Sequence, residues 1–175
     1  MNIFVTNPDP HVSAKVLPDK HVVKMPLETT QMVSLLFSPW YYDWGKVLRK
    51  DGTPYDTKKG AFRNHPCTQW AAASLYNTAW LIQHGCALSG EYTHRYGRLH
   101  GCHKALFGAK ITFHQFAGEV ITCYCMVESF TRAMPNEFKH NTSIDTFTAY
   151  QNYISSKPWV ASNYLRDPSR KPDWI

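Results

Sequence analysis

The amino-acid sequence predicts a mainly α-helical protein in which residues 1–175 form a single compact domain with long loops. Apolar residues recur at helical spacing in several segments, and neither an internal repeat nor a linker divides the chain. Apolar residues make up 43% of the chain and charged residues 18%, which is typical of a globular protein rather than a disordered one. A chain of this length is long enough for one domain to bury a core.

The composition limits where the protein works and what it binds. The sequence has no run of about 18 apolar residues, so we expect no membrane-spanning helix. The first residues lack the basic and apolar regions of a signal peptide, which predicts a cytoplasmic protein. A net charge of +6 together with 14% aromatic residues suits a nucleic-acid partner, because cations bind phosphates and flat rings stack on unpaired bases.

The cysteine and histidine patterns do not indicate a metal site. The five cysteines are odd in number and accompany no secretion signal, so a disulfide framework is not expected. Neither a Cys-x2-Cys nor a His-x3-His spacing occurs, and we expect no metal and no cofactor. We expect most of the cysteines to be small buried side chains.

The first elements are short. Residues 3–6 are apolar and predict either a brief strand or an extended arm. The Asn-Pro-Asp-Pro sequence at 7–10 is turn chemistry and prevents a helix from starting before about residue 11. A short helix over residues 11–17 then leads into a longer one.

Residues 17–37 predict an amphipathic helix with Asp19 as its N-cap. Glu28 lies at the border between its polar and apolar sides, where a carboxylate with a shifted pKa is expected, and Pro26 should kink the helix or confine its regular part to later residues. The alternative is that the polar side is only a solvated surface. The apolar side consists of Val22, Met25, Met32, Val33 and Leu36, and the polar stripe of His21, Lys24, Glu28 and Gln31.

Residues 38–63 predict a long loop that is rich in rings and cations. A loop of this length in a compact domain is usually functional or disordered, and its composition suits contact with phosphates and bases. A solvated loop with a few packed rings is the alternative. The candidate base-stacking residues are Trp40, Tyr41, Tyr42 and Trp44, and the candidate phosphate contacts are Lys46, Arg49, Lys50, Lys58, Lys59 and Arg63.

The pattern after the loop predicts further helices. Asn64 or His65 can cap a helix that has Pro66 at its first position and closes at Gly85, and a second helix over 86–96 ends at Gly97. Its last turn and the residues beyond it form a basic cluster suited to a phosphate, with Arg95, Arg98 and His100. Residues 117–130 fit a buried helix, although their β-branched content leaves this assignment open. Ser143 or Asp145 starts another helix, and residues 157–175 predict an irregular basic and aromatic tail.

The order of these features resembles the pyrimidine-dimer DNA glycosylase family, to which phage endonuclease V belongs. The similar features are Leu-Pro-Asp-Lys-His at 17–21 with Glu28 later in the same helix, Asn-His-Pro at 64–66 opening a Trp-rich helix, and Arg-Tyr-Gly at 95–97. Met-Pro-Asn-Glu-Phe-Lys at 134–139 and the Trp-containing tail also resemble the end of that family. The similarity covers most of the chain, and phage and bacterial relatives share this layout.

The resemblance implies an all-helical fold and a glycosylase that attacks the sugar C1′ of a damaged pyrimidine with an N-terminal amine. It implies that Glu28 is the catalytic carboxylate and that the partner is duplex DNA, with damaged or modified bases as candidate substrates. His21 and His65 join Glu28 as candidate catalytic residues, and Lys20 and Lys24 join the candidate DNA contacts. In this chain the residue after Met1 is the bulky Asn2, and Leu27 replaces the arginine that precedes the glutamate in the family.

The sequence is compatible with three functions. The first is a DNA glycosylase, with or without strand-cleaving lyase activity. The second is a non-catalytic nucleic-acid-binding protein of a phage or mobile element, which would also explain the charge and the rings. The third is an enzyme that acts on free nucleotides. Lys20 or Lys24 could replace the N-terminal amine as nucleophile.

Overall fold

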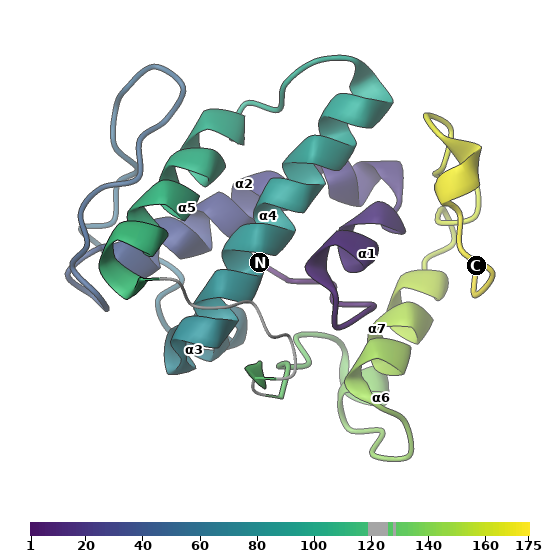
Figure 1. The fold of residues 1–175 in the computed structure, drawn as a ribbon. Helices are drawn as coiled ribbons and strands as arrows, with labels where there is room; N and C mark the ends of the chain where they lie inside the picture. Colours follow the sequence, from purple (N-terminus) through teal and green to yellow (C-terminus); the bar gives the residue numbers. More distant parts are fainter. Residues whose placement is uncertain (119–125, 128) are drawn as a thin grey trace.

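The structure is a computed structural model that describes residues 1–118, 126–127 and 129–175. The described part is helical, and its strand-like pairing is limited to an isolated bridge between Leu48 and Pro54. The predicted mainly α-helical single domain is confirmed (Figure 1). The helices are α1 (Pro10–Lys15), α2 (Asp19–Phe37), α3 (Pro66–Ala73), α4 (Leu75–Tyr96), α5 (His103–Ala117), α6 (Asn136–Lys139) and α7 (Thr146–Ser155), followed by a 3-10 turn, η2 (Pro168–Arg170).

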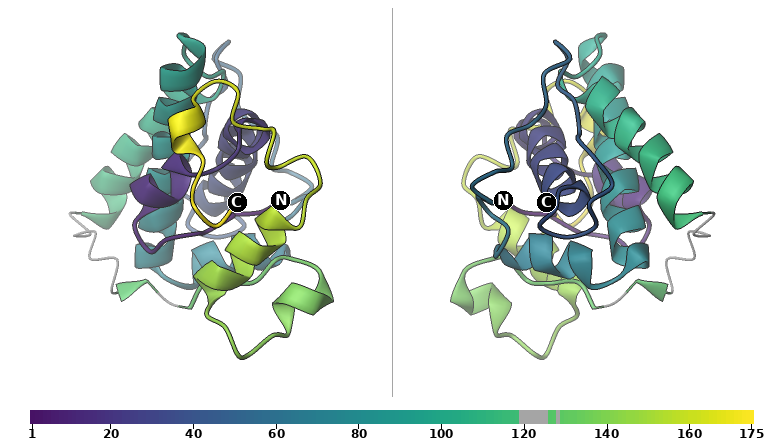
Figure 2. Two further views of the ribbon diagram at one scale, coloured as in Figure 1. Left: turned by 90° about the vertical axis from the view of Figure 1, so that its right-hand side faces the viewer. Right: turned by 90° about the vertical axis from the view of Figure 1, so that its left-hand side faces the viewer.

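Helix α4 is the centre of the fold. It packs against α1, α2, α3 and α5, and Figure 1 shows it running through the middle of the molecule. Figure 2 shows α6 and α7 at one end, from which the C-terminal segment runs along the side. No helix in the described ranges is both long and apolar enough to cross a membrane.

Helix α2 buries its predicted apolar side, including Val22, Met32 and Leu36. The helix runs unbroken through Pro26, so its regular part is not confined to the residues that follow the proline. The prediction of an Asp19 N-cap is wrong, because Pro18 precedes the helix and makes no side-chain cap. The Asp19 carboxylate instead has tertiary partners, which are described below with the site.

The boundary between α3 and α4 differs from the prediction. The break is at Ser74, whose hydroxyl accepts a hydrogen bond from the Asn77 N–H, and not at Gly85. The carbonyls at the end of α3 are bound by side chains of α4, because Asn77 Nδ2 donates to Trp70 O and Thr78 Oγ1 donates to Ala71 O. These bonds stabilise a helix end that the helix-favouring alanine run does not reveal.

Gly85 lies inside α4, where the helix packs closely against α2 and α5. A Cβ added at Gly85 would lie 2.6 Å from Thr29 Cγ2 and 2.9 Å from Leu106 Cδ2. The glycine therefore allows close helix packing rather than ending a helix. The helix does end at Gly97, as predicted, with a φ of 65° that suits glycine.

The other elements are close to the predictions, with one exception. The N-terminal residues form a buried arm, with Ile3 and Val5 almost fully covered, and α7 starts after the predicted cap Asp145. His65 caps α3 and Pro66 takes its first position, as predicted. Helix α5 was not expected, and most of the helix predicted over residues 117–130 lies outside the described residues. The described cysteines, Cys67, Cys86 and Cys102, are buried and free, as predicted.

Candidate active site

Glu28 is buried in the middle of α2, with 9% of its surface exposed. Its Oε1 lies 3.1 Å from Lys24 Nζ, one helical turn earlier, and its Oε2 lies 3.8 Å from the N-terminal nitrogen of Met1. The polar stripe of α2 is therefore not a solvated surface at this position. A covered carboxylate between two amines can exchange protons with either of them.

The N-terminal amine is held in place by the arm that carries it. Asn2 Oδ1 accepts hydrogen bonds from the N–H groups of Ile3 and Phe4, and Asn2 Nδ2 donates to Ala133 O at 2.7 Å. Phe4 has a φ of 42°, a left-handed conformation that costs a bulky residue about 1–3 kcal/mol. The apolar burial of the arm offsets this cost and fixes the direction of the first residue.

A cavity of about 390 Å³ opens beside the amine and the carboxylate. Three parts of the chain build its walls: the N-terminal arm, α2, and the segment from the end of α7 into the tail. Its lining combines lysine side chains with aromatic rings. The lining residues are Met1, Asn2, Phe4, Lys20, His21, Lys24, Met25, Glu28, Tyr153, Lys157 and Trp159.

Four rings form a continuous wall of this cavity. His21 stacks on Phe4 with ring centroids 4.0 Å apart, Phe4 in turn stacks on Tyr153 at 6.0 Å, and Trp159 meets His21 edge-on at 5.7 Å. Burying these rings against one another orders the tail over α2. The wall offers flat surfaces to a sugar or a base beside Glu28.

Two lysines lie over these rings. Lys20 Nζ is 4.4 Å from the centroid of Trp159, and Lys157 Nζ is 4.0 Å from that of Tyr153. Together with Lys24 they bring three positive charges to the cavity that Glu28 lines. Such an arrangement attracts a polyanion and leaves the ammonium groups able to turn toward phosphates.

His21 is neutral at ordinary pH. Burial, followed by the charges of Lys157 and Lys24, lowers its pKa from 6.5 to about 3. Its Nδ1 is buried without a hydrogen-bond partner among the described residues. His21 can therefore pack and form neutral hydrogen bonds in the cavity, but it does not carry a proton as a cation near pH 7.

His65 faces the same charges from the start of α3. Its Nδ1 accepts a hydrogen bond from the Cys67 N–H at 3.2 Å, so a neutral ring carries its proton on Nε2. Burial lowers the pKa of His65, the N-terminal ammonium lowers it further, and Glu28 opposes the change. His65 does not line the cavity. It lies close enough to the amine and the carboxylate to be influenced by both.

Arg95 is not positioned for phosphate contact, contrary to the sequence-based expectation. Its side chain is fully buried, where Nη1 donates to Leu17 O and Asp19 Oδ1, and Nε donates to Glu91 Oε1. Its Nη2 donates to Lys15 O. The guanidinium joins α4 to the start of α2 and is a structural group.

The neighbouring basic residues are also partly engaged. Arg98 is exposed and donates to the Tyr92 hydroxyl at 3.3 Å. Both ring nitrogens of His100 have partners, because Nε2 lies 3.0 Å from Val23 O and Nδ1 accepts from the Cys102 N–H. Neither residue lines the cavity around Glu28, so a role of Arg98 or His100 in DNA binding remains a prediction.

The rings of the loop over residues 38–63 do not reach the cavity. Tyr42 and Trp44 stack 4.3 Å apart and pack on the core, and the Tyr41 hydroxyl donates to Arg63 O. Trp40 donates to Thr57 O and lies under the Arg63 guanidinium. These contacts favour the alternative interpretation of the loop, in which its rings pack on the protein rather than stack on bases. The cations Lys46, Arg49, Lys50, Lys58 and Lys59 are exposed, but they too lie outside the cavity lining.

Sequence reasoning missed several cavity residues, namely Phe4, Tyr153, Lys157 and Trp159. The available signal was the basic and aromatic composition of the tail, which does not reveal where the tail packs. Within residues 1–118, 126–127 and 129–175, no three His, Cys, Asp or Glu side chains group as metal ligands.

The family model described as "Pyrimidine dimer DNA glycosylase" matches residues 1–103. The match includes the arm, Glu28, Lys24 and His65, whereas the cavity residues of the tail lie beyond it. The searches of curated proteins and of solved structures gave no match. The family model covers more than half of the 175 residues, and the chain belongs to the pyrimidine dimer DNA glycosylase family.

Proposed function

We propose that this protein is a DNA glycosylase in which the Met1 α-amine attacks the sugar C1′ and Glu28 is the catalytic carboxylate. The observation that carries the proposal is the 3.8 Å separation between the Met1 nitrogen and Glu28 Oε2 beside an open cavity. A protein that only binds DNA has no need for a strained arm that directs an amine onto a buried carboxylate.

The proposed reaction assigns one task to each group. Glu28 accepts the proton that the ammonium must lose, the amine nitrogen bonds to C1′, and the base leaves with the electron pair of the broken glycosidic bond and takes up a proton. The C1′–O4′ bond then opens as the amine nitrogen forms a double bond to C1′, and Glu28 returns its proton to O4′. This step yields a cationic imine, which the regenerated carboxylate stabilises. Lys20, Lys24 and Lys157 hold the phosphates on either side of the sugar.

The choice of Met1 over Lys24 rests on the chemistry of the two amines. Lys24 Nζ is closer to Glu28, but its side chain is 70% exposed, whereas Met1 lies in the covered wall of the cavity. α-Amines as a class are weaker bases than lysine side chains by about 2.5 pKa units, so a larger fraction is neutral and nucleophilic near pH 7. If Met1 is cleaved off in the cell, the amine of Asn2 takes this role.

The substrate that best suits the site is a damaged or modified pyrimidine in duplex DNA. The ring wall gives a flat surface beside Glu28, and a lesion that weakens stacking lowers the cost of bringing the nucleotide into the cavity. Lyase cleavage of the strand follows from the imine. We propose it as the second step at the same site.

Borohydride trapping tests the proposal directly. The protein is incubated with duplexes that each carry one lesion, including cyclobutane pyrimidine dimers and abasic sites, and borohydride reduces any imine to a stable adduct. We expect an adduct whose peptide map places the DNA on residue 1. A map that places it on Lys24 would reject Met1 as the nucleophile, and no adduct and no base release on any duplex would reject the reaction.

Two variants separate chemistry from binding. Glu28→Gln should lower base release by about 10²–10⁴-fold while duplex affinity is retained, because the amide can neither accept the proton nor stabilise the cation. Glu137→Gln, at an exposed glutamate of α6, is the matched control and should behave as wild type. Equal activity of the two variants would remove Glu28 from the mechanism. Intact mass measurement shows whether Met1 or Asn2 carries the amine.

A further inference from the structure

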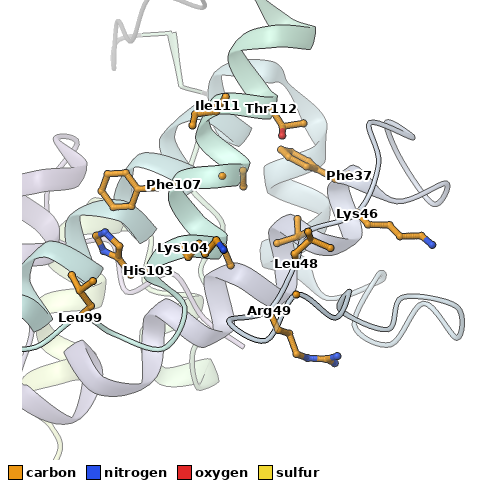
Figure 3. Close-up of a pocket in the computed structure, with 15 residues that line it drawn as sticks. Phe37, Lys46, Leu48, Arg49, Leu99, His103, Lys104, Phe107, Ile111 and Thr112 are labelled. Atoms are coloured by element: carbon orange, nitrogen blue, oxygen red, sulfur yellow. The ribbon is translucent and has the colours of Figure 1, made fainter.

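A second, larger hollow lies between α5 and the loop segment 46–52. Its volume is about 690 Å³, and it opens to solvent (Figure 3). Leu99, His103 and Phe107 lie on one side of it in Figure 3, and Phe37 and Leu48 lie on the other. The base is formed by the buried side chains of Phe37, Val47, Ala105 and Ala109, and the exposed apolar walls by Leu48, Leu99, Phe107 and Ile111.

The groove exists because small residues of α5 face it. Ala105, Gly108 and Ala109 contribute no bulky side chains, and a Cβ added at Gly108 would have no atom within 4 Å. The wall residues are well exposed, with 62% of Ile111 and 50% of Leu48 open to water. An exposed apolar groove of this kind on a protein surface is typical of a binding site.

The groove is separate from the cavity around Glu28, since no residue lines both. A ligand in the groove therefore does not occupy the cavity around Glu28. The groove does not depend on the proposed glycosylase reaction.

The charged side chains that line the groove are positive, and Asp51 of the same loop segment, which interacts with Arg49, is not part of the lining. Lys46, Arg49 and Lys104 are part of its lining, and no Asp or Glu of the described residues is. Helix α5 contains Lys104 and Lys110 but no acidic residue. Arg49 is held in place by hydrogen bonds to Pro54 O and Thr53 Oγ1. The partner that complements this rim must carry negative charge.

The apolar walls distinguish between the possible anionic partners. A nucleic acid presents phosphates and sugars along its surface and would leave four exposed apolar side chains without partners. An amphipathic peptide places apolar side chains in a groove and keeps its charged ones at the edge.

We propose that the groove between α5 and residues 46–52 binds an acidic amphipathic segment of a partner protein. Leucine- or phenylalanine-like side chains of the segment fill the space above Gly108, and its carboxylates pair with Lys46, Arg49 and Lys104. This assigns Lys46 and Arg49 to a protein partner rather than to DNA.

The probe is a fluorescein-labelled synthetic helical peptide with leucines at positions i, i+4 and i+7 and Asp or Glu elsewhere, measured by fluorescence anisotropy. We expect binding that weakens as salt rises, because exposed charge pairs are screened. Lys104→Glu should weaken binding by about tenfold. The same peptide with lysine in place of Asp and Glu should not bind.

Gly108→Trp tests the groove itself. An added Cβ at Gly108 meets open space, so the helix should fold normally. The tryptophan side chain should fill the groove and abolish peptide binding, while base release from DNA is unchanged. Val12→Ser removes a similarly exposed apolar side chain from α1 and is the matched control. Peptide binding that Gly108→Trp does not alter would overturn the proposal.

Two further outcomes would also overturn it. If duplex DNA displaces the peptide, the groove is part of the nucleic-acid surface. If the wild-type protein dimerises in sedimentation equilibrium and Gly108→Trp is monomeric, the occupant is a second copy of the chain. If the wild-type protein binds the peptide but releases no base from DNA, only the glycosylase proposal is rejected and the groove proposal stands.

Discussion

Arg95 joins the end of α4 to the start of α2 from a fully buried position, and its replacement is the sharpest test of how this fold is held together. The guanidinium pairs with Asp19 at 3.0 Å and Glu91 at 2.9 Å, and it also binds two backbone carbonyls. Arg95→Met keeps most of the side-chain volume but leaves both carboxylates without this partner. Removing one member of a buried ion pair typically costs about 3–5 kcal/mol.

The remaining contacts place the expected loss at the lower end of that range. Asp19 keeps the N–H of Arg166 at 3.1 Å, and Glu91 keeps Arg170 at 2.8 Å. We therefore expect Arg95→Met to lower the free energy of unfolding by about 3 kcal/mol. For a chain of this size, a loss of that magnitude lowers Tm by roughly 6–12 °C.

Urea unfolding followed by far-UV circular dichroism measures this effect. Arg98→Met, at the exposed arginine just beyond α4, is the matched control and should change stability by less than about 0.5 kcal/mol. The double variant Arg95→Met/Asp19→Asn should recover part of the loss, because one uncompensated charge is removed. If Arg95→Met is no less stable than Arg98→Met, the buried charge network does not stabilise the protein and this reasoning is refuted.

Three more outcomes follow from individual residues. Gly90 lies in α4 with no atom within 4 Å of an added Cβ, so Gly90→Ala should raise the free energy of unfolding in urea by about 1 kcal/mol. Gly85→Ala should lower it, because the new Cβ would meet Thr29. A stability gain for both variants would contradict the close packing of α2 and α4. Burial lowers the pKa of His84 to about 3, and neither of its nitrogens has a hydrogen-bond partner among the described residues. Since the unfolded chain binds the proton near pH 6.5, stability should fall as pH drops from about 6.5 toward 3, by up to about 1.4 kcal/mol per pH unit. His84→Phe should reduce the difference in thermal stability between pH 5 and pH 7. If the difference is unchanged, other groups cause the pH dependence. Lys157→Ala should raise KM for duplex DNA and reduce its salt dependence with little change in kcat; a large fall in kcat alone would argue against a phosphate contact.

Much of the local structure could be predicted because it depends on neighbouring residues. The apolar face of α2, the His65 cap before Pro66, the Asp145 cap of α7 and the end of α4 at Gly97 are each determined within a few residues. The break at Ser74 was missed because side chains of the following helix satisfy the carbonyls at the end of α3. Local propensity alone favours a continuous helix there.

The candidate site also combines features that the sequence predicts with features that only the tertiary structure shows. Glu28 could be selected from its place on the border of an amphipathic helix and from the family resemblance. Its burial, its approach to the Met1 amine, and the ring wall of Phe4, Tyr153 and Trp159 could not.

The sequence by itself determined a helical protein with a carboxylate at the edge of the apolar face of α2, because helical periodicity is a local property of the chain. The tertiary structure alone decided that this carboxylate meets an amine and a cavity, and that Arg95 is buried rather than facing DNA. The hydrogen bond between Asn2 and Ala133 spans 131 positions in the chain, and the one between Arg95 and Asp19 spans 76. Pairings over such separations depend on how whole helices pack, which no local pattern encodes.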